Sequence, residues 1–188
     1  MPNAPAFADG GNMAAQCPGI PCFITGTVKG LDGTPIAGAA LDMWSNDGEG
    51  LYEAQRPEIT DTWMRGIYHS KPDGSYLIRT VAPIGYTIPL DGTVGEVFAR
   101  NNISPYRPAH IHFMIKAPGF HAVTTHLFQL GDQYIETDVV YGVKEPLIVE
   151  FEKKPAGSKA PNGEILNEPF YEVRYDFTLQ RLAQAAAA

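Results

Sequence analysis

The sequence lacks a run of about 18 apolar residues, so it predicts no transmembrane helix. It also has little positive charge: 14 lysines and arginines stand against 21 aspartates and glutamates, a formal net charge of −7. Such an acidic chain is poorly suited to phosphate backbones or anionic membranes. The start of the chain, Met1 to Asp9, has neither the basic cluster nor the apolar segment of a secretory signal. We therefore expect a cytoplasmic protein without nucleic-acid or membrane partners.

Cysteine is scarce, with Cys17 and Cys22 as the only two. A Cys-x4-Cys pair is at best half of a zinc site. A strained local disulfide is one alternative, and two free thiols are what a cytosolic chain favours. A chain of 188 residues can form a core without disulfides, because it can bury roughly 70% of its unfolded surface.

Helical periodicity is nearly absent, whereas strand patterns recur with turn signals between them. Residues 171–179 alternate apolar and polar side chains, which predicts a half-buried strand. The turn at 71–74 is predicted to close a hairpin, and Pro118-Gly119 separates two further strands. The predicted strands cover 23–29, 39–44, 64–70, 75–82, 109–116, 122–130, 146–152 and 171–179. This pattern indicates an all-β fold, a two-sheet β-sandwich with little helix.

Two internal stretches lack a strand pattern. Residues 83–108 contain many prolines and glycines, with one predicted helical turn near 94–101. A loop of that length inside a compact domain is more often functional than idle. Residues 153–168 are polar and contain two prolines, which predicts a surface loop.

The predicted organisation is one domain with short extensions. Residues 1–21 are small, polar and proline-containing, and form a predicted N-terminal arm. The β-sandwich is expected over 22–182. The alanine-rich end, 183–188, is predicted to be a frayed tail.

The main candidate for chemistry is the segment Arg107-Pro-Ala-His-Ile-His112. Because side chains alternate along a strand, His110 and His112 would share one face, with Cα atoms roughly 6.5–7 Å apart. Two neutral imidazoles can then bind one metal ion. Pro108 forces Arg107 into an extended conformation close to that face. Two surface histidines on a solvated strand are the alternative for so short a pattern.

Several other kinds of site do not fit the residues present. A cupin would want a glutamate four or five residues after the second histidine, where Lys116 and Ala117 stand. A facial triad would begin with His-x-Asp or His-x-Glu. The sequence contains no nucleophile elbow, P-loop or dinucleotide motif. His126 is predicted to lie within a strand, fourteen residues after His112.

Tyrosine is the other abundant donor, and Tyr52 and Tyr86 lie in glycine-containing segments outside clean strands. A tyrosinate needs strong cationic help, because the ordinary pKa of tyrosine is near 10. A trivalent metal ion supplies that help. Two phenolates and two imidazoles would leave Fe(III) with a single net positive charge, which suits a dianionic substrate. Each tyrosine alone would equally fit a packed ring with a bonded hydroxyl.

A set of short motifs occurs in a characteristic order and spacing: Ile24-Thr-Gly-Thr-Val28, Pro35-Ile-Ala-Gly-Ala39, Leu41-Asp-Met-Trp44, Gly50-Leu-Tyr52, Asp73-Gly-Ser-Tyr76, Tyr86, Asp91-Gly92, Arg107 to His112 and Thr125-His126. With these motifs the chain resembles the catalytic domain of intradiol ring-cleavage dioxygenases over most of its length. Within the family it looks most like hydroxyquinol 1,2-dioxygenases. That likeness is carried by Ala117-Pro-Gly-Phe120, Thr125-His-Leu-Phe128, Gly131-Asp132 and Asp138-Val-Val-Tyr-Gly-Val143.

The resemblance implies a prealbumin-like sandwich topology and a non-haem Fe(III) cofactor. Tyr52 and His110 would be the equatorial iron ligands, and Tyr86 and His112 the axial ones. Arg107 would stabilise negative charge on the substrate ring. His126 stands where catechol-cleaving members usually carry glutamine, and would act near the substrate without binding the metal.

The implied reaction opens a catechol-type ring between its two hydroxyls with O2 and gives a muconate-type diacid, with hydroxyquinol favoured as the substrate and maleylacetate as its product. A non-enzymatic, prealbumin-like binding module is the alternative, since Ile24 to Trp44 also resembles such domains. Related enzymes begin with a helical region that supports a dimer and one wall of the pocket. Only about 20 residues precede the sandwich here, so we expect a stand-alone or truncated catalytic domain, and a homodimer stays open.

Overall fold

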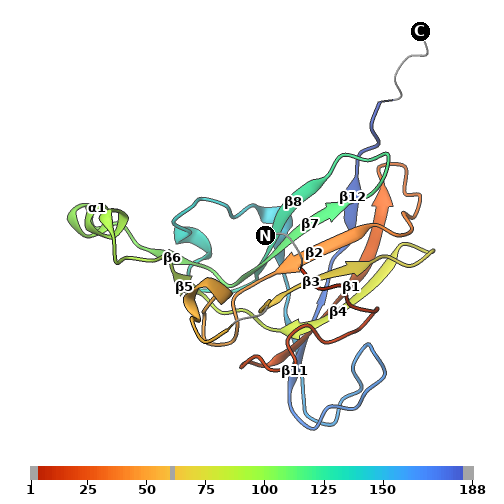
Figure 1. Ribbon diagram of the computed structural model, residues 1–188, viewed down its shortest axis with the longest axis horizontal. Coiled ribbons are helices and arrows are strands. Elements are labelled where there is room, and N and C mark those ends of the chain that lie inside the picture. Colours follow the sequence, from red (N-terminus) through yellow and green to blue (C-terminus); the bar gives the residue numbers. More distant parts are fainter. Residues whose placement is uncertain (1–3, 60–61, 184–188) are drawn as a thin grey trace.

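The computed structural model describes residues 4–59 and 62–183. In this part of the chain, strands predominate, a single α-helix is present, and two five-stranded sheets face each other (Figure 1). Apolar side chains at alternating strand positions point from both sheets into the space between them and form the main core. The expected two-sheet sandwich is confirmed. None of the helices formed by these residues has the length and apolar character needed to cross a membrane.

The first sheet is built around β1 (Pro21–Gly30). On one side β1 pairs antiparallel with β4 (Ser75–Val81). On the other side it pairs in parallel with β11 (Phe170–Arg174) and then with β12 (Phe177–Leu179). The short strand β10 (Glu152–Lys154) extends the sheet beyond β11. Segments from the beginning and the end of the sandwich are therefore neighbours in this sheet.

The single strand predicted over 171–179 is wrong in one detail, because it is interrupted at Tyr175 and Asp176. The Asp176 side chain accepts a hydrogen bond from the Thr27 amide at 2.9 Å. At Gly26 the chains approach so closely that a Cβ would lie 1.7 Å from the Tyr175 carbonyl oxygen. The register with β1 is the same on both sides of the interruption, so the break is local.

The second sheet carries the candidate site and has the order β3-β2-β7-β8-β9. Its strands are β2 (Ala40–Trp44), β3 (Arg65–His69), β7 (His110–Lys116), β8 (Val123–Gln129) and β9 (Ile148–Val149). β7 and β8 form an antiparallel hairpin around Pro118-Gly119. Because β7 has β2 on one side and β8 on the other, its backbone is supported along both edges.

The turn at 71–74 is tight, as predicted, with Gly74 at φ 77° and its amide bonded to the Lys71 carbonyl at 2.8 Å. The hairpin predicted around it is wrong, because β3 pairs with β2 while β4 pairs with β1. The turn instead carries the chain from one sheet to the other. Turn chemistry specifies a chain reversal, but it does not specify which strands then become partners.

The prediction of a strand over 146–152 is also only partly right. The segment contains most of a 3-10 turn, η3 (Glu145–Leu147), then β9, and ends at the first residue of β10 in the other sheet. Pro146 lies in the first turn of η3, where proline is well tolerated. The loop predicted over 153–168 is wrong at its start, because its first two residues belong to β10. The loop begins after Lys154.

The long segment 83–108 leaves the sandwich, as Figure 1 shows. At its base β5 (Tyr86–Thr87) pairs antiparallel with β6 (Tyr106–Arg107), and α1 (Thr93–Asn101) lies beyond them. The helical turn predicted near 94–101 is confirmed as this nine-residue helix. Two further 3-10 turns are η1 (Glu53–Gln55) and η2 (Ile135–Thr137).

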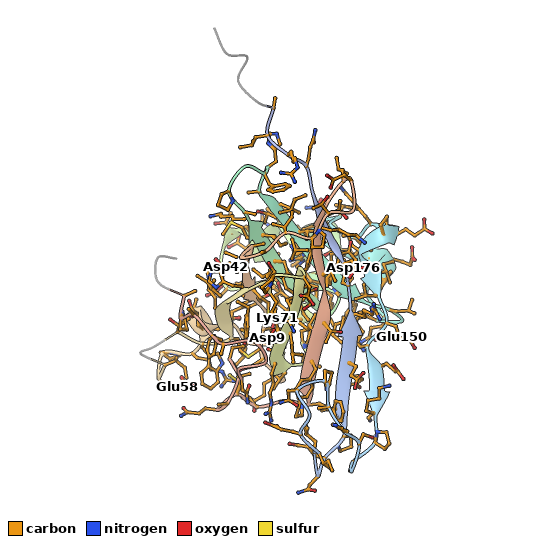
Figure 2. The ribbon with its side chains drawn as sticks, turned by 90° about the vertical axis from the view of Figure 1, so that its right-hand side faces the viewer. Asp9, Asp42, Glu58, Lys71, Glu150 and Asp176 are labelled. Atoms are coloured by element: carbon orange, nitrogen blue, oxygen red, sulfur yellow. The ribbon has the colours of Figure 1, made fainter. Side chains whose placement is uncertain are left out.

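The described part of the N-terminal arm packs closely on the sandwich. The Phe7 ring stacks on Tyr68, with 5.5 Å between centroids, and Met13 is buried in the main core. Asp9 pairs with Lys71 at 3.4 Å, and their labels lie together in Figure 2. Of the tail predicted at 183–188, all but the first residue lies outside the described residues.

The prediction of two free thiols is confirmed for Cys17 and Cys22. Cys22 is fully buried on β1, and Cys17 is half-buried. Burial raises the pKa of Cys17 to about 11, and it raises the pKa of Cys22 further. Both sulfurs therefore remain protonated and unreactive at neutral pH.

Candidate metal centre and active site

The sequence-predicted donors meet near the end of the second sheet where β2 finishes and β7 begins. His110 and His112 lie on β7, and His126 lies opposite His112 on β8. Tyr52 ends the loop that follows β2, immediately before η1, and Tyr86 begins β5. Segments from four different parts of the chain thus bring these side chains together.

The nitrogen and oxygen atoms of the cluster lie within contact distance of one another. The Nε2 atoms of His110 and His112 are 3.1 Å apart, and the Tyr52 hydroxyl lies 3.3 Å from His112 Nε2. The Tyr86 ring packs against Tyr52 and His110, with centroid distances of 5.3 and 5.6 Å. All four residues named as metal ligands from the sequence therefore lie next to one another.

Both histidines are held in the neutral form that binds metal ions. His110 Nδ1 lies 2.7 Å from the Pro108 carbonyl oxygen, which can only accept, so Nδ1 carries the proton and Nε2 presents its lone pair to the cluster. Burial and the charge of Arg107 lower the pKa of His110 to about 3. Burial and the neighbouring His110 lower the pKa of His112 to about 2.

The Tyr52 hydroxyl is hard to ionise in this setting. Burial and the nearby Tyr86 raise the pKa of the Tyr52 hydroxyl far above its ordinary value, while Arg107 acts in the opposite direction. A phenol this hard to ionise becomes a phenolate only beside a highly charged metal ion. Two neutral imidazoles and two neighbouring phenols are a donor set that fits a trivalent ion.

Arg107 lies beside the donors and is only 6% exposed. Its Nε donates to Asp138 at 3.1 Å, and its NH1 lies 3.0 Å from His110 Nε2. The remaining NH2 group is buried and has no hydrogen-bond partner among the described residues. A buried donor without an acceptor is unfavourable, so an anionic ligand at this point would satisfy it.

His126 is closer to the donors than the sequence suggested. The rings of His112 and His126 are 4.4 Å apart between centroids, and the nitrogens of the three histidines all lie within 4.8 Å of one another. Burial and the charge of Arg107 lower the pKa of His126, so it too favours the neutral form. A neutral imidazole here can both donate and accept a hydrogen bond.

Sequence reasoning missed Asp47, which organises the loop that carries Tyr52. Its fully buried carboxylate accepts the Leu51 amide at 3.1 Å, the Arg56 Nε at 2.8 Å and the Trp63 indole at 3.4 Å. Although burial opposes ionisation, the Leu51 amide and the Arg56 guanidinium lower the pKa of Asp47. A buried carboxylate cannot be told from a surface one in a sequence, so no signal marked it.

Sequence reasoning also missed Asp138 and Trp44 as supporting residues. Asp138 anchors the Arg107 guanidinium from 31 residues away, and the Trp44 ring stacks on His112. Both residues belong to motifs that carried the family resemblance, which was the only signal available for them.

Comparison with known proteins agrees with this geometry. A family model described as "Dioxygenase" matches residues 6–181. The chain is 39% identical over 176 residues to the hydroxyquinol 1,2-dioxygenase of Nocardioides simplex, covering 94% of this chain and 60% of that protein. It is 30% identical over 185 residues to the catechol 1,2-dioxygenase of Candida albicans, covering 95% of this chain and 59% of that protein.

Solved structures show the same likeness. The hydroxyquinol 1,2-dioxygenase from Pseudomonas putida DLL-E4 matches with a TM-score of 0.88 and 38% identity, over 97% of this chain and 63% of that one. The chain spans about 60% of the length of the curated relatives it matches. These matches do not favour the alternative of a non-enzymatic binding module. Because the family match runs through nearly the whole chain, this chain belongs to the dioxygenase family.

Proposed function

We propose that this chain is the catalytic part of a non-haem Fe(III) dioxygenase, with hydroxyquinol as its favoured substrate. It would cleave the ring between two adjacent hydroxyls with O2 and give a muconate-type diacid, which for hydroxyquinol is maleylacetate. The observation that carries the proposal is the meeting of two neutral imidazoles and two tyrosines beside a buried guanidinium with an unpaired N–H.

Tyr52, Tyr86, His110 and His112 would hold the iron. When bound there, Fe(III) would supply a Lewis acid and a template for the substrate's two oxygens. Burial of the Tyr52 hydroxyl favours a highly charged ion there, because such an ion helps a phenol to ionise. The Pro108 carbonyl fixes the His110 tautomer, so that its Nε2 lone pair remains available to the ion.

Arg107 would stabilise negative charge that develops on the substrate ring. Its position is set in advance by Asp138, so little reorganisation is needed when the charge appears. The unpaired NH2 group supplies a hydrogen-bond donor in a buried setting, where such a bond is strong. Asp138 keeps the guanidinium from adding an uncompensated charge to the site.

Tyr86 would take up a substrate proton at its phenolic oxygen. It lies at the base of the 83–108 segment, opposite Arg107 in the short β5–β6 pair, and not within either large sheet. A side chain placed there is held less firmly than an imidazole on β7. Its phenolate oxygen can then act as a general base toward a substrate hydroxyl.

The preference for hydroxyquinol is supported by His126, whose imidazole can hydrogen-bond a third ring hydroxyl. Relatives named hydroxyquinol 1,2-dioxygenase reach 40% identity, whereas the catechol 1,2-dioxygenase of Candida albicans reaches 30%. The two free cysteines further support a reducing compartment such as the cytoplasm.

The reaction is tested with protein reconstituted with Fe(III). We expect a red-brown protein, from tyrosinate-to-iron charge transfer, that consumes O2 with hydroxyquinol and yields an intradiol product spectrum. Catechol and protocatechuate complete the substrate panel. A protein that stays colourless after reconstitution would instead favour a binding module.

Substrate preference is tested separately with His126→Gln. We expect wild type to show a higher kcat/KM for hydroxyquinol than for catechol, and His126→Gln to lower that ratio roughly tenfold, the effect of losing about one hydrogen bond. His69→Gln, an exposed histidine on β3, is the matched control. An unchanged ratio in His126→Gln would remove hydroxyquinol as the favoured substrate and leave the intradiol class.

A further inference from the structure

The two histidines on β7 are oriented in different ways. The ring of His110 is fixed by the hydrogen bond from its Nδ1 to the Pro108 carbonyl oxygen. For His112, none of the described residues forms a hydrogen bond with Nδ1. Metal-binding histidines normally use that second nitrogen to hold the ring in place. Unlike that of His110, the ring plane of His112 is therefore not set by a hydrogen bond from Nδ1 to any of these residues.

The ring of Trp44 lies against His112 in a nearly parallel stack. Their centroids are 4.8 Å apart, and the angle between the planes is 5°. Trp44 and His112 are direct cross-strand partners on β2 and β7, so the backbone register itself brings them together. Rotation of the imidazole about its Cβ–Cγ bond would break this contact.

Trp44 is in turn held from the other side of β2. Arg65 on β3 is its cross-strand partner, and the guanidinium carbon lies 5.2 Å from the Trp44 ring centroid. Two hydrogen bonds to Asp42, at 3.1 and 2.7 Å, keep that guanidinium in place. Asp42 lies two residues before Trp44, so both side chains point to the same face of β2.

The resulting row runs across three neighbouring strands in the order Arg65, Trp44, His112. The Arg65 guanidinium lies over the Trp44 ring, and the Trp44 ring lies over the His112 imidazole. The first contact limits rotation of the indole, and the second limits rotation of the imidazole. The carboxylate of Asp42 satisfies the guanidinium, so Arg65 stays over the indole and is not drawn toward the metal position.

We propose that Trp44, braced by Arg65 and Asp42, is a positioning residue that fixes the ring plane of His112 and so aims its Nε2 at the metal. The proposal rests on the proposed metal site, but it does not depend on which reaction that site performs. It assigns to stacking the role that a hydrogen bond plays for His110.

The test compares Trp44→Leu, which removes the stack, with Trp44→Phe, which keeps an aromatic ring. Fe(III) affinity is measured by competition with a chelator, and Zn²⁺ affinity by calorimetry. We expect Trp44→Leu to weaken both by about 10–100-fold, the usual effect of losing a residue that orients a ligand. Trp44→Phe should restore most of the loss, and a charge-transfer band displaced in Trp44→Leu should return toward its wild-type position.

Phe120→Leu is the matched control, because Arg181 lies 4.7 Å over the Phe120 ring and neither residue belongs to the centre. It should lower thermal stability without changing metal affinity. Arg65→Met should weaken metal binding less than Trp44→Leu, roughly 2–30-fold, because it removes only the cation from the stack.

A direct readout is the ring-proton chemical shift of His112 in the metal-free protein, which Trp44→Leu should move downfield by removing the indole ring current. The proposal is overturned if Trp44→Leu keeps wild-type metal affinity, or if Phe120→Leu weakens metal binding as much. Wild-type protein that binds iron but cleaves no catechol would refute the proposed reaction and leave this inference intact. Wild-type protein that binds neither Fe(III) nor Zn²⁺ would refute both.

Discussion

The histidines and the tyrosines of the candidate centre are held by two different regions of the molecule. His110 and His112 lie on β7, which has paired strands along both edges. Tyr52 and Tyr86 lie in segments that belong to neither large sheet. Tyr52 depends on the buried carboxylate of Asp47, two bonds of which reach amides of its own loop.

This difference matches the chemistry proposed for the two histidines and for Tyr86. An imidazole that only donates a lone pair benefits from a rigid strand, since any rotation weakens the metal bond. A phenol that exchanges a proton benefits from a place outside the large sheets, because such a segment can move without breaking them. The centre therefore combines a fixed half with an adaptable half, and variants on each half should behave differently.

Removal of a strand-held donor should have the largest effect. We expect His110→Ala to lose nearly all iron, and with it all turnover, because no neighbouring backbone movement can replace a rigidly placed nitrogen. Iron content per chain after desalting measures this, with circular dichroism to confirm that the sandwich has folded. Full iron content in folded His110→Ala would contradict the ligand assignment.

Removal of the donor on the short strand β5 should spare the metal and slow the reaction. Tyr86→Phe should retain most of its iron, show a displaced visible band, and react about 10²–10⁴-fold more slowly, the range for loss of a general base. Rapid-mixing spectroscopy with substrate measures both properties. If the spectrum and the rate both match wild type, Tyr86 is neither ligand nor base.

Replacement of Arg107 should lower turnover without preventing metal binding. Arg107→Ala should fold and bind iron, with turnover lower by about 10²–10³-fold, as for loss of one preorganised donor. The measurement is kcat at saturating substrate alongside iron content. Loss of iron or of the fold would instead mark Arg107 as a structural residue, and unchanged turnover would exclude the proposed role.

The smallest expected effect concerns pH and the metal-free protein. The folded state holds the pKa of His110 at about 3 and that of His112 at about 2, below the ordinary value of histidine. The unfolded chain therefore takes up protons first, so the free energy of unfolding should fall as the pH drops below about 6.5. Urea unfolding at several pH values measures the slope, which His112→Gln should reduce by about one proton. An identical slope in His112→Gln would show that His112 is not held neutral.

Much of the fixed half could be predicted from the sequence. Period-two alternation places His110 and His112 on one face of a strand, and a proline at 108 holds the chain extended before it. These are local constraints that act within a few residues. The number of strand patterns likewise indicated a sandwich before any strand pairing was known.

Contacts between distant segments could not be predicted in the same way. The Asp138 carboxylate under Arg107, the Asp47 network behind Tyr52 and the Trp44 ring on His112 all require knowledge of which segments become neighbours. The same limit explains why the hairpin predicted at 71–74 was wrong. The turn reverses the chain, but the strands on its two sides belong to different sheets.

The sequence by itself determined the strand pattern, the face shared by the two histidines and the family to which the chain belongs, because each follows from local alternation or from short motifs. Tertiary structure alone decided which side chains support the donors. Strand partners are chosen by burying apolar faces over the whole chain, and a cross-strand neighbour such as Arg65 for Trp44 exists only once β3 has paired with β2.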